Sequence, residues 1–309
     1  MSSHWLRKPP VIPRGEGRPT IFLMGGERPG PVPGARETQA AFPVRSRRAC
    51  GSRYFSSLKI EMTAGPGVYN KEIMRATTAE PYLTLPGFRR LGWLAHGFGT
   101  AAWSLADFRK TGDWRMFKPV ILKQIHSNIV RRVDRVPERR PEGDALITAE
   151  PGVLLIIKTA DCLPVLIADP ERRVVAAAHC GWRGTQKRIL DGVIDELRSA
   201  YGCEPASLRV AFGPAIGPRC YEVGQEVRTA YAASGFPPGV FERVPGRADK
   251  YLLDLKKANA WLLKRRGVRA KNIFSIDACT HCDPRFFSYR RDRNKSARMF
   301  NFVGIRRRG

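Results

Sequence analysis

Residues 153–180 read VLLIIKTADCLPVLIADPERRVVAAAHC, and this stretch decides the fold class. It contains three apolar runs, at 153–158, 163–168 and 174–178, which are separated by short polar turns. Apolar runs of this length between turns are typical of strands, whereas core helices need about ten residues or more. The stretch therefore predicts three consecutive strands.

On either side of this stretch, the sequence predicts further strands and two clear helices. One helix is predicted over 185–201, where apolar residues share one face and Gly202 follows as a C-terminal cap. A second is predicted over 255–266 and ends at Gly267. Further strands are predicted at 120–125, 208–212 and 272–277. Because strands outnumber helices and do not alternate with them one for one, the pattern predicts an α+β layered domain and not a doubly wound one.

Residues 1–80 differ in composition from the rest of the chain. They contain nine prolines and nine glycines, with 13 lysines and arginines against six acidic residues, and show no sustained helical or strand period. This composition predicts a disordered extension, which leaves residues 81–309 as a single folded domain. An arginine-rich targeting peptide is the alternative, and the six acidic residues argue against it.

The sequence also bears on the location of the protein. No apolar run reaches the roughly 18 residues that a membrane helix needs, so no membrane partner is expected. Pro9, Pro10 and Pro13 interrupt the region where a signal peptide needs an apolar segment. We therefore predict a cytoplasmic protein, in which the seven cysteines serve as thiols or metal ligands and not as a disulfide framework.

The formal net charge of +26 suggests a nucleic-acid-binding protein as one hypothesis. The charge is spread along the chain without one dominant basic block. Zinc-finger spacing and aromatic RNA-binding motifs are absent from the sequence. Nucleic acid is therefore not the expected partner, although nucleic-acid binding stays as the alternative from a different functional class.

Three predicted strands each end in a residue that can bind a metal. His126 follows the run at 120–125, Cys162 follows the run at 153–158, and His179 ends the run at 174–178. Two imidazoles and one thiolate suit zinc and leave a fourth tetrahedral position open. The alternative is that each is a core residue. Cys180 competes with Cys162 as the thiolate, but it should face away from its neighbour His179 if the strand persists.

Other polar residues have two interpretations each. The turn around Arg183 and Gly184 leads into a predicted helix and is either a phosphate site or a tight turn packed by Trp182. Arg290 contacts an anionic substrate or forms a surface ion pair. A C-x-H-C cluster consists either of structural cysteines or of a second metal site, and its three members are Cys279, His281 and Cys282.

Six sequence blocks together resemble the signatures of the laccase-domain family, which is known as multicopper polyphenol oxidase or zinc-dependent purine nucleoside phosphorylase. The resemblance runs from His96 to Ile305 and departs from the family pattern after Thr100, where Ala101 and Ala102 replace the customary arginine and glycines. It implies a mixed four-layer α/β/β/α fold. The blocks are LKQIHS (122–127), GDALIT (143–148), TADCLPVLIAD (159–169), AAAHCGWRGT (176–185), GPAIGPRCYEV (213–223) and CTHCDPRFFSYRRD (279–292).

The resemblance also implies a site and an activity. The family's zinc ligands fall on His126, Cys162 and His179, with one zinc per chain. The implied reactions are phosphorolysis of adenosine, inosine, guanosine or methylthioadenosine, with a nucleoside and phosphate as partners, and deamination of adenosine. Asp161 is then either a proton acceptor or the cap of a turn. A peptidoglycan-precursor editing amidohydrolase is the alternative enzyme. Copper is the alternative metal, but five histidines without any His-x-His pair are too few for a multicopper centre.

Overall fold

The computed structural model describes residues 70–72, 80–108 and 115–307. Most of the extension predicted at 1–80 lies outside these described residues, and so does part of the region after Ala102 where the family pattern is lost. Within the predicted extension, Asn70–Glu72 form strand β1, which pairs in parallel with strand β14 (Ile273–Ile276).

Two mixed β-sheets form the body of the domain. Three further strands form a small antiparallel sheet in the order β11 (Glu222–Gly224), β13 (Lys250–Leu253) and β12 (Phe241–Arg243). The five-stranded sheet has the order β2 (Tyr82–Leu83), β3 (Leu94–Gly99), β15 (Met299–Ile305), β7 (Val153–Thr159) and β4 (Lys118–Ile121). The seven-stranded sheet has the order β1, β14, β10 (Arg209–Phe212), β8 (Leu163–Asp169), β9 (Val174–Cys180), β6 (Ala145–Thr148) and β5 (Val130–Arg132).

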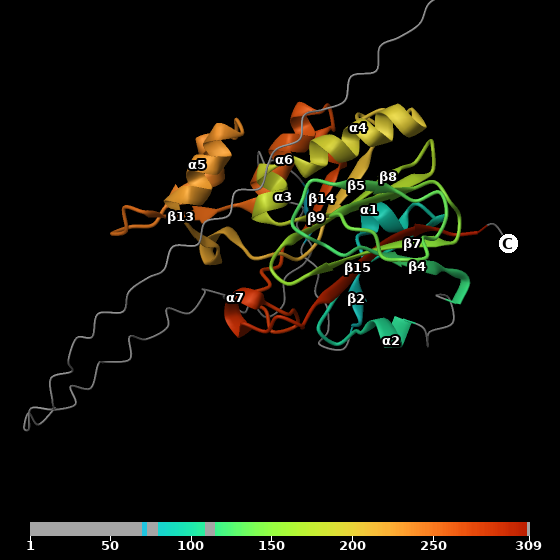
Figure 1. Cartoon of the computed structure of the whole chain (residues 1–309), viewed down its shortest axis with the longest axis horizontal. Coiled ribbons are helices and arrows are strands. Elements are labelled where there is room, and N and C mark those ends of the chain that lie inside the picture. The colour runs from blue at the N-terminus through green and yellow to red at the C-terminus, as the bar shows by residue number, and fades with distance from the viewer. Residues whose placement is uncertain (1–69, 73–79, 109–114, 308–309) are drawn as a thin grey trace, which may run out of the picture. The chain divides into compact units, whose positions relative to one another are not determined.

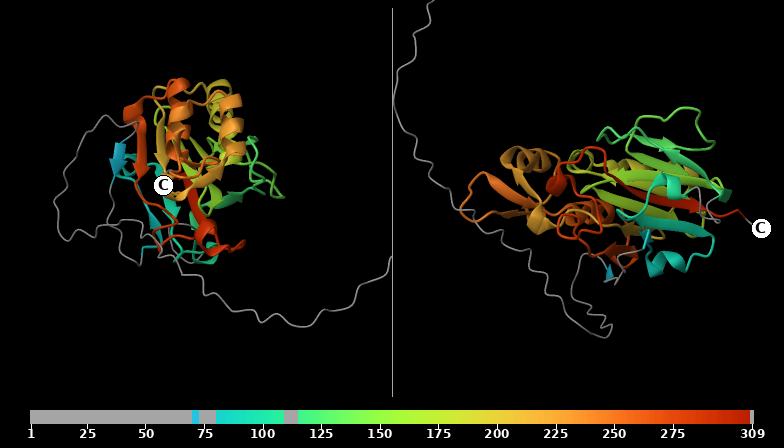
Figure 2. Two further views of the ribbon diagram at one scale, coloured as in Figure 1. Left: turned by 90° about the vertical axis from the view of Figure 1, so that its left-hand side faces the viewer. Right: turned by 90° about the horizontal axis from the view of Figure 1, so that it is seen from below.

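The longer helices cover the outer face of the seven-stranded sheet, and one short helix lies on the outer side of the five-stranded sheet, which gives the four-layer α/β/β/α arrangement that the resemblance implied (Figure 1). The left view of Figure 2 shows the helices that are coloured yellow and orange on one side of the sheets. On the outer face of the five-stranded sheet, the buried ring of Trp103 packs on Phe302, and the short helix α2 lies nearby. The described helices are α1 (Pro86–Arg89), α2 (Leu105–Phe108), α3 (Trp182–Gln186), α4 (Ile189–Tyr201), α5 (Gln225–Ala233), α6 (Leu255–Arg265) and α7 (Tyr289–Asp292).

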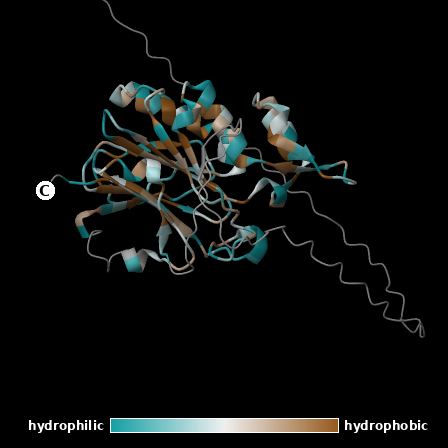
Figure 3. Ribbon diagram, turned by 180° about the vertical axis from the view of Figure 1, so that it is seen from behind, coloured by the Kyte–Doolittle hydropathy of each residue, from teal (hydrophilic) through white to brown (hydrophobic). Residues whose placement is uncertain are grey.

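The central strands are apolar on both faces because both faces are covered. In β8, Val165 and Ile167 pack with the helices, whereas Leu166 and Ala168 pack between the two sheets. All seven residues of β8 are buried, and Figure 3 shows the resulting hydrophobic strands in the middle of the domain. Each fully buried aliphatic side chain contributes roughly 1.5–3 kcal/mol to the free energy of unfolding. The three strands predicted from residues 153–180 are therefore confirmed.

Two predicted elements differ from the structure. The helix predicted from Thr185 begins earlier, at Trp182, and is interrupted at Arg188, whose left-handed backbone (φ 61°) separates α3 from α4. The cap at Gly202 is confirmed, with φ at 64°. The strand predicted at 120–125 ends at Ile121, as β4. In the part of the chain that the structure describes, every helix is too short to cross a membrane.

Candidate metal centre

The structure brings the three predicted metal-binding residues together. His126 comes from the loop after β4, Cys162 from the turn between β7 and β8, and His179 from β9. Their ligand atoms all lie within 4.8 Å of one another, and the two imidazole rings have centroids 4.9 Å apart. His179 is buried, Cys162 is half-buried and His126 is exposed. The group is therefore closed on the side of the sheet and open to solvent beside His126.

His126 reaches this position because the chain leaves the sheet early. Gln124 forms two hydrogen bonds with the backbone of Lys158 in β7: its side-chain amide donates to the carbonyl at 2.8 Å, and its side-chain oxygen accepts from the N–H at 2.7 Å. The side chain thus takes the place of a strand backbone, which is why the predicted strand ends at Ile121. Freed from the sheet, His126 adopts a left-handed backbone with φ of 56°.

Asp144, which precedes β6, organises two of the three donors. One carboxylate oxygen lies 2.8 Å from Nδ1 of His179 and 3.1 Å from the backbone N–H of His126. The other accepts hydrogen bonds from the backbone N–H and hydroxyl of Ser127, at 2.6 and 2.7 Å. A carboxylate that holds one ring nitrogen of a histidine orients the other nitrogen toward a metal. Asp144 was missed in the sequence analysis, although the GDALIT block contains it.

The electrostatics of the group favour a positive charge between its donors. Burial alone would lower the pKa of His179, but the negative charge of Cys162 and the hydrogen bond to Asp144 raise this pKa to about 9. Burial would raise the pKa of Asp144, yet hydrogen bonds from His179 and Ser127 lower it to about 2. Burial and the neighbouring His179 lower the pKa of His126. A bound cation would balance the negative charges of Cys162 and Asp144 in place of a proton on His179. Both imidazoles would then be neutral, as metal ligation requires.

The two residues after His179 leave room for a metal at the group. A Cβ atom on Gly181 would lie 2.9 Å from Sγ of Cys162 and 3.1 Å from Nδ1 of His126, so a side chain at this position would crowd both donors. Cys180 is fully buried and belongs to the core cluster on the helix side of the sheet. As predicted from the strand geometry, it faces away from the group that contains Cys162.

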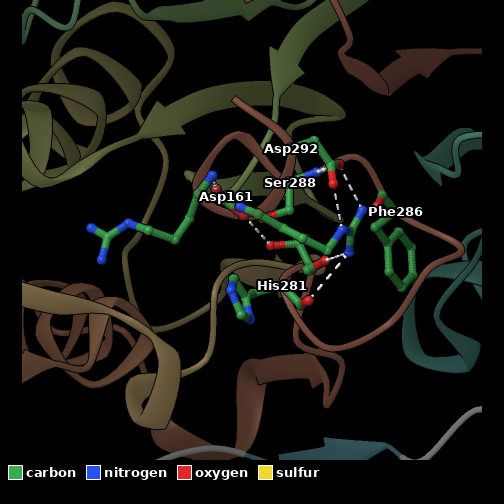
Figure 4. A network of polar contacts seen from close by, with 8 residues as sticks. Asp161, His281, Phe286, Ser288 and Asp292 are labelled. Atoms are coloured by element: carbon green, nitrogen blue, oxygen red, sulfur yellow. Dashed lines mark hydrogen bonds and ion pairs between the residues drawn. The ribbon is translucent and has the colours of Figure 1, made fainter. Parts of the chain in front are cut away.

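Asp161 anchors the turn that carries Cys162. Its carboxylate accepts a hydrogen bond from the hydroxyl of Thr280 at 2.7 Å and another from the backbone N–H of Arg290 at 2.6 Å (Figure 4). Its backbone carbonyl accepts from the N–H of Ile216 at 2.9 Å, and its own φ of 83° is left-handed. The partners of the carboxylate lie 119 and 129 positions away in the sequence, so Asp161 ties the turn of Cys162 to a distant loop. Both roles considered for Asp161, the proton acceptor and the cap of its own turn, stay predictions.

Two arginines lie near His126, on the open side of the group, and a third contacts Tyr221. The charges of Arg183 and Arg298 both contribute to the lowered pKa of His126. The guanidinium of Arg183 packs over the ring of Trp182, at 4.3 Å from its centroid. The guanidinium of Arg290 lies 5.3 Å from the ring centroid of Tyr221 and donates to the carbonyl of Glu222. Arg183 and Arg290 were predicted from the sequence, whereas Arg298 was not.

Gly184 has a packing role in the structure. A Cβ atom at this position would lie 3.0 Å from the carbonyl oxygen of Ser127 and 3.4 Å from that of His179. The absence of a side chain therefore lets α3 approach the loop that carries His126. Because α3 has only five residues, its dipole gives little support to the phosphate site predicted at this turn.

Residues 106–306 match the model of a family described as "Multi-copper polyphenol oxidoreductase laccase". The chain belongs to this family. Curated relatives of the chain carry a different name, purine nucleoside phosphorylase. The protein of that name from Deinococcus radiodurans is 44% identical over 168 residues, which are 54% of this chain and 63% of the relative, slightly less than two thirds. "Purine nucleoside phosphorylase YfiH" from Escherichia coli is 39% identical over 189 residues, 61% of this chain and 74% of the relative.

Solved structures of related proteins have the same fold. The structure of YlmD from Geobacillus stearothermophilus aligns with a TM-score of 0.66 and 29% identity, covering 78% of this chain and all of that one. A protein named YfiH from Bacillus licheniformis aligns with a TM-score of 0.67 and 27% identity, covering 74% and 98%. The family description mentions copper, but a chain with five histidines has too few imidazoles for a multicopper centre.

Proposed function

We propose that this member of the laccase family is a zinc-dependent purine nucleoside phosphorylase that also deaminates adenosine, and that it acts in the cytoplasm. The observation that carries the proposal is the convergence of His126, Cys162 and His179 on one point beside a solvent opening. The names of the curated relatives supply the substrate class, a purine nucleoside and phosphate.

The donor set fits zinc better than the other common biological ions. Two imidazoles and one thiolate are borderline-soft donors, and three protein ligands leave one tetrahedral position for substrate or water. Asp144 and Gly181 support the same assignment, because one orients a ligand and the other leaves space for the ion. When bound, zinc supplies Lewis acidity at the open position.

Residues of the chain itself account for binding of the second substrate. Phosphorolysis needs a phosphate anion held against the anomeric carbon of the nucleoside. Cations that already line the site lower the free energy needed to place the anion there. We assign this role to the guanidinium groups of Arg183 and Arg290, with support from the charge of Arg298. Asp161 keeps the turn of Cys162 and the backbone of Arg290 in fixed relation, so it acts as a positioning residue.

Product analysis tests the proposal. Purified protein is incubated with adenosine or inosine, with and without inorganic phosphate, and the products are separated by chromatography. We expect free purine base and ribose 1-phosphate only when phosphate is present, and inosine from adenosine in its absence. Base release that does not depend on phosphate, or no conversion of any nucleoside by zinc-loaded protein, would contradict the assignment.

A further inference from the structure

A second group of donors lies outside the candidate metal centre. Cys220, His281 and Cys282 have their ligand atoms within 4.8 Å of one another, and the two Sγ atoms are 3.2 Å apart. The C-x-H-C pattern in the sequence pairs Cys279 with Cys282, but only Cys282 belongs to this group in the structure. The sulfur of Cys279 accepts a hydrogen bond from the backbone N–H of Gly217 and is not part of the group.

Two loops from distant parts of the sequence form this group. Cys220 is the last residue of the 3-10 helix Pro218–Cys220, and the other two donors lie between β14 and α7. The loops are already joined beside the donors, since Ala215 forms a bridge with Cys279 and its carbonyl accepts from the N–H of Thr280 at 3.0 Å. The donors are therefore held together by the backbone before any ion binds.

The backbone around His281 is fixed as well. The guanidinium of Arg291 donates to the carbonyls of Thr280 and His281, at 2.9 and 3.2 Å, and to the carbonyl of Phe286 (Figure 4). In this network His281 takes part through its carbonyl, which leaves its ring for the second donor group. Because this backbone is already fixed, binding of an ion by the ring does not have to order it, which lowers the entropic cost of binding.

We propose that Cys220, His281 and Cys282 form a second, structural zinc site. Two thiolates and one imidazole are a donor set that zinc prefers, and half-burial of all three gives an ion access from solvent. A disulfide between Cys220 and Cys282 would explain two of the three residues. It would need the sulfurs to approach from 3.2 Å to about 2.05 Å and would leave the position of His281 without a reason.

The site lies where an ion can steady the walls of the candidate centre. Cys220 precedes Tyr221, whose ring carries the guanidinium of Arg290, and Thr280 precedes His281 and donates to Asp161. Zinc at the second site thus ties together the two loops that contact the turn of Cys162. The proposal stands on its own donor geometry and does not depend on the activity of the first site.

Cobalt binding tests the second zinc site. Cobalt(II) replaces zinc and absorbs strongly in the near ultraviolet when thiolates bind the ion. Metal-free protein is loaded with cobalt(II), freed of excess by gel filtration, and assayed for metal content and absorption. We expect about two ions per chain in the wild type and about one in Cys282→Ser. Cys279→Ser is the matched control from the same C-x-x-C motif, and it should still bind about two.

Two further variants keep the test decisive. Cys162→Ser disables the first site, so any cobalt-thiolate absorption that it retains comes from the second site. His281→Gln removes a ligand without touching a thiol and should weaken cobalt binding at the second site by roughly tenfold or more. Wild-type stoichiometry in Cys282→Ser, equal loss in Cys279→Ser, or loss of all thiolate absorption in folded Cys162→Ser would overturn the proposal. A disulfide between Cys220 and Cys282 in the purified protein, detected by mass spectrometry as the loss of two hydrogen atoms, would also overturn it.

Discussion

The two donor groups of this protein are similar in chemistry and differ in what supports them. In the first group, His179 lies on the buried strand β9, and a fully buried carboxylate binds its ring and the backbone N–H of His126. Cys162 and His126 lie in the turn and the loop that follow β7 and β4. The second group, formed by Cys220, His281 and Cys282, lies on loops, and all three of its donors are half-buried. The first is also flanked by arginines, which the proposed chemistry needs.

This difference indicates a division of roles. A buried histidine that is held by Asp144 cannot turn away when substrate exchanges at the open position, so the first group suits turnover. Loop-borne donors with two thiolates suit an ion that stays in place and steadies the backbone. We therefore expect zinc-loaded protein to hold about one ion in each group.

The largest effect should come from removing the thiolate of the first group. Cys162→Ser should lose zinc from this group and lose turnover, because a hydroxyl is a far poorer zinc ligand. Cys180→Ser is the matched control, since its sulfur lies in the core on the other face of the strand, and its turnover should stay near wild type. Zinc content and turnover are measured after circular dichroism has shown that both variants are folded. Equal losses would mean that the ligand set includes Cys180.

A smaller loss of zinc affinity or turnover is expected when Asp144 is changed, the carboxylate that supports only the first group. Asp144→Asn places an amide opposite three backbone N–H groups and should reduce zinc affinity or turnover by about 10–100-fold. Asp134→Asn, an exposed partner of Arg132, is the control and should change neither. If Asp144→Asn binds zinc as tightly as the wild type does, buried support is not what separates the two groups.

The space beside the first group allows a finer test. Gly181→Ala adds a methyl 2.9 Å from Sγ of Cys162 and should weaken zinc binding without removing a ligand, by less than Asp144→Asn does. Gly192→Ala in α4 meets only an ordinary contact of 3.5 Å with Val130, and should stabilise the fold by about 0.5–1 kcal/mol. Competition with a chromophoric chelator gives the zinc affinities. An unchanged affinity in Gly181→Ala would place the ion elsewhere.

The smallest effect should follow truncation, because neither donor group includes residues from the N-terminal region. Deleting residues 1–69 should leave zinc content and turnover unchanged. Deleting residues 1–79 also removes β1 from the edge of the seven-stranded sheet and should lower Tm slightly, by about 2–4 °C for each kcal/mol lost. Calorimetry gives the Tm of the two truncated proteins, and assays of zinc content and turnover test the rest of the prediction. Loss of activity on removal of residues 1–69 would show that the domain begins earlier than the sequence pattern predicts.

Much of the fold was predictable because its central strands coincide with apolar runs in the local sequence. The runs at 153–158, 163–168 and 174–178 are buried on both faces, so hydrophobicity alone identifies them. The end of β4 was not predictable in this way, because the side chain of Gln124 replaces backbone pairing with a residue 34 positions away. The break at Arg188 likewise comes from backbone geometry at a residue that ordinarily favours helices.

For the site, the sequence identified the donors but not their support. His126, Cys162 and His179 follow from strand ends and family motifs, whereas Asp144 acts through hydrogen bonds to residues 17 to 35 positions distant. The C-x-x-C spacing suggested that Cys279 and Cys282 act together. The structure instead groups Cys282 with Cys220, which no local pattern connects to it.

X-ray diffraction at the zinc absorption edge, from crystals of the protein as purified, tests the central claim most directly. We predict an anomalous peak about 2.3 Å from Sγ of Cys162 and about 2.0–2.1 Å from one ring nitrogen each of His126 and His179. The signal should vanish below the zinc edge, and no comparable peak should appear at the copper edge. An empty space between these three residues in active protein, or a copper signal there, would contradict the account.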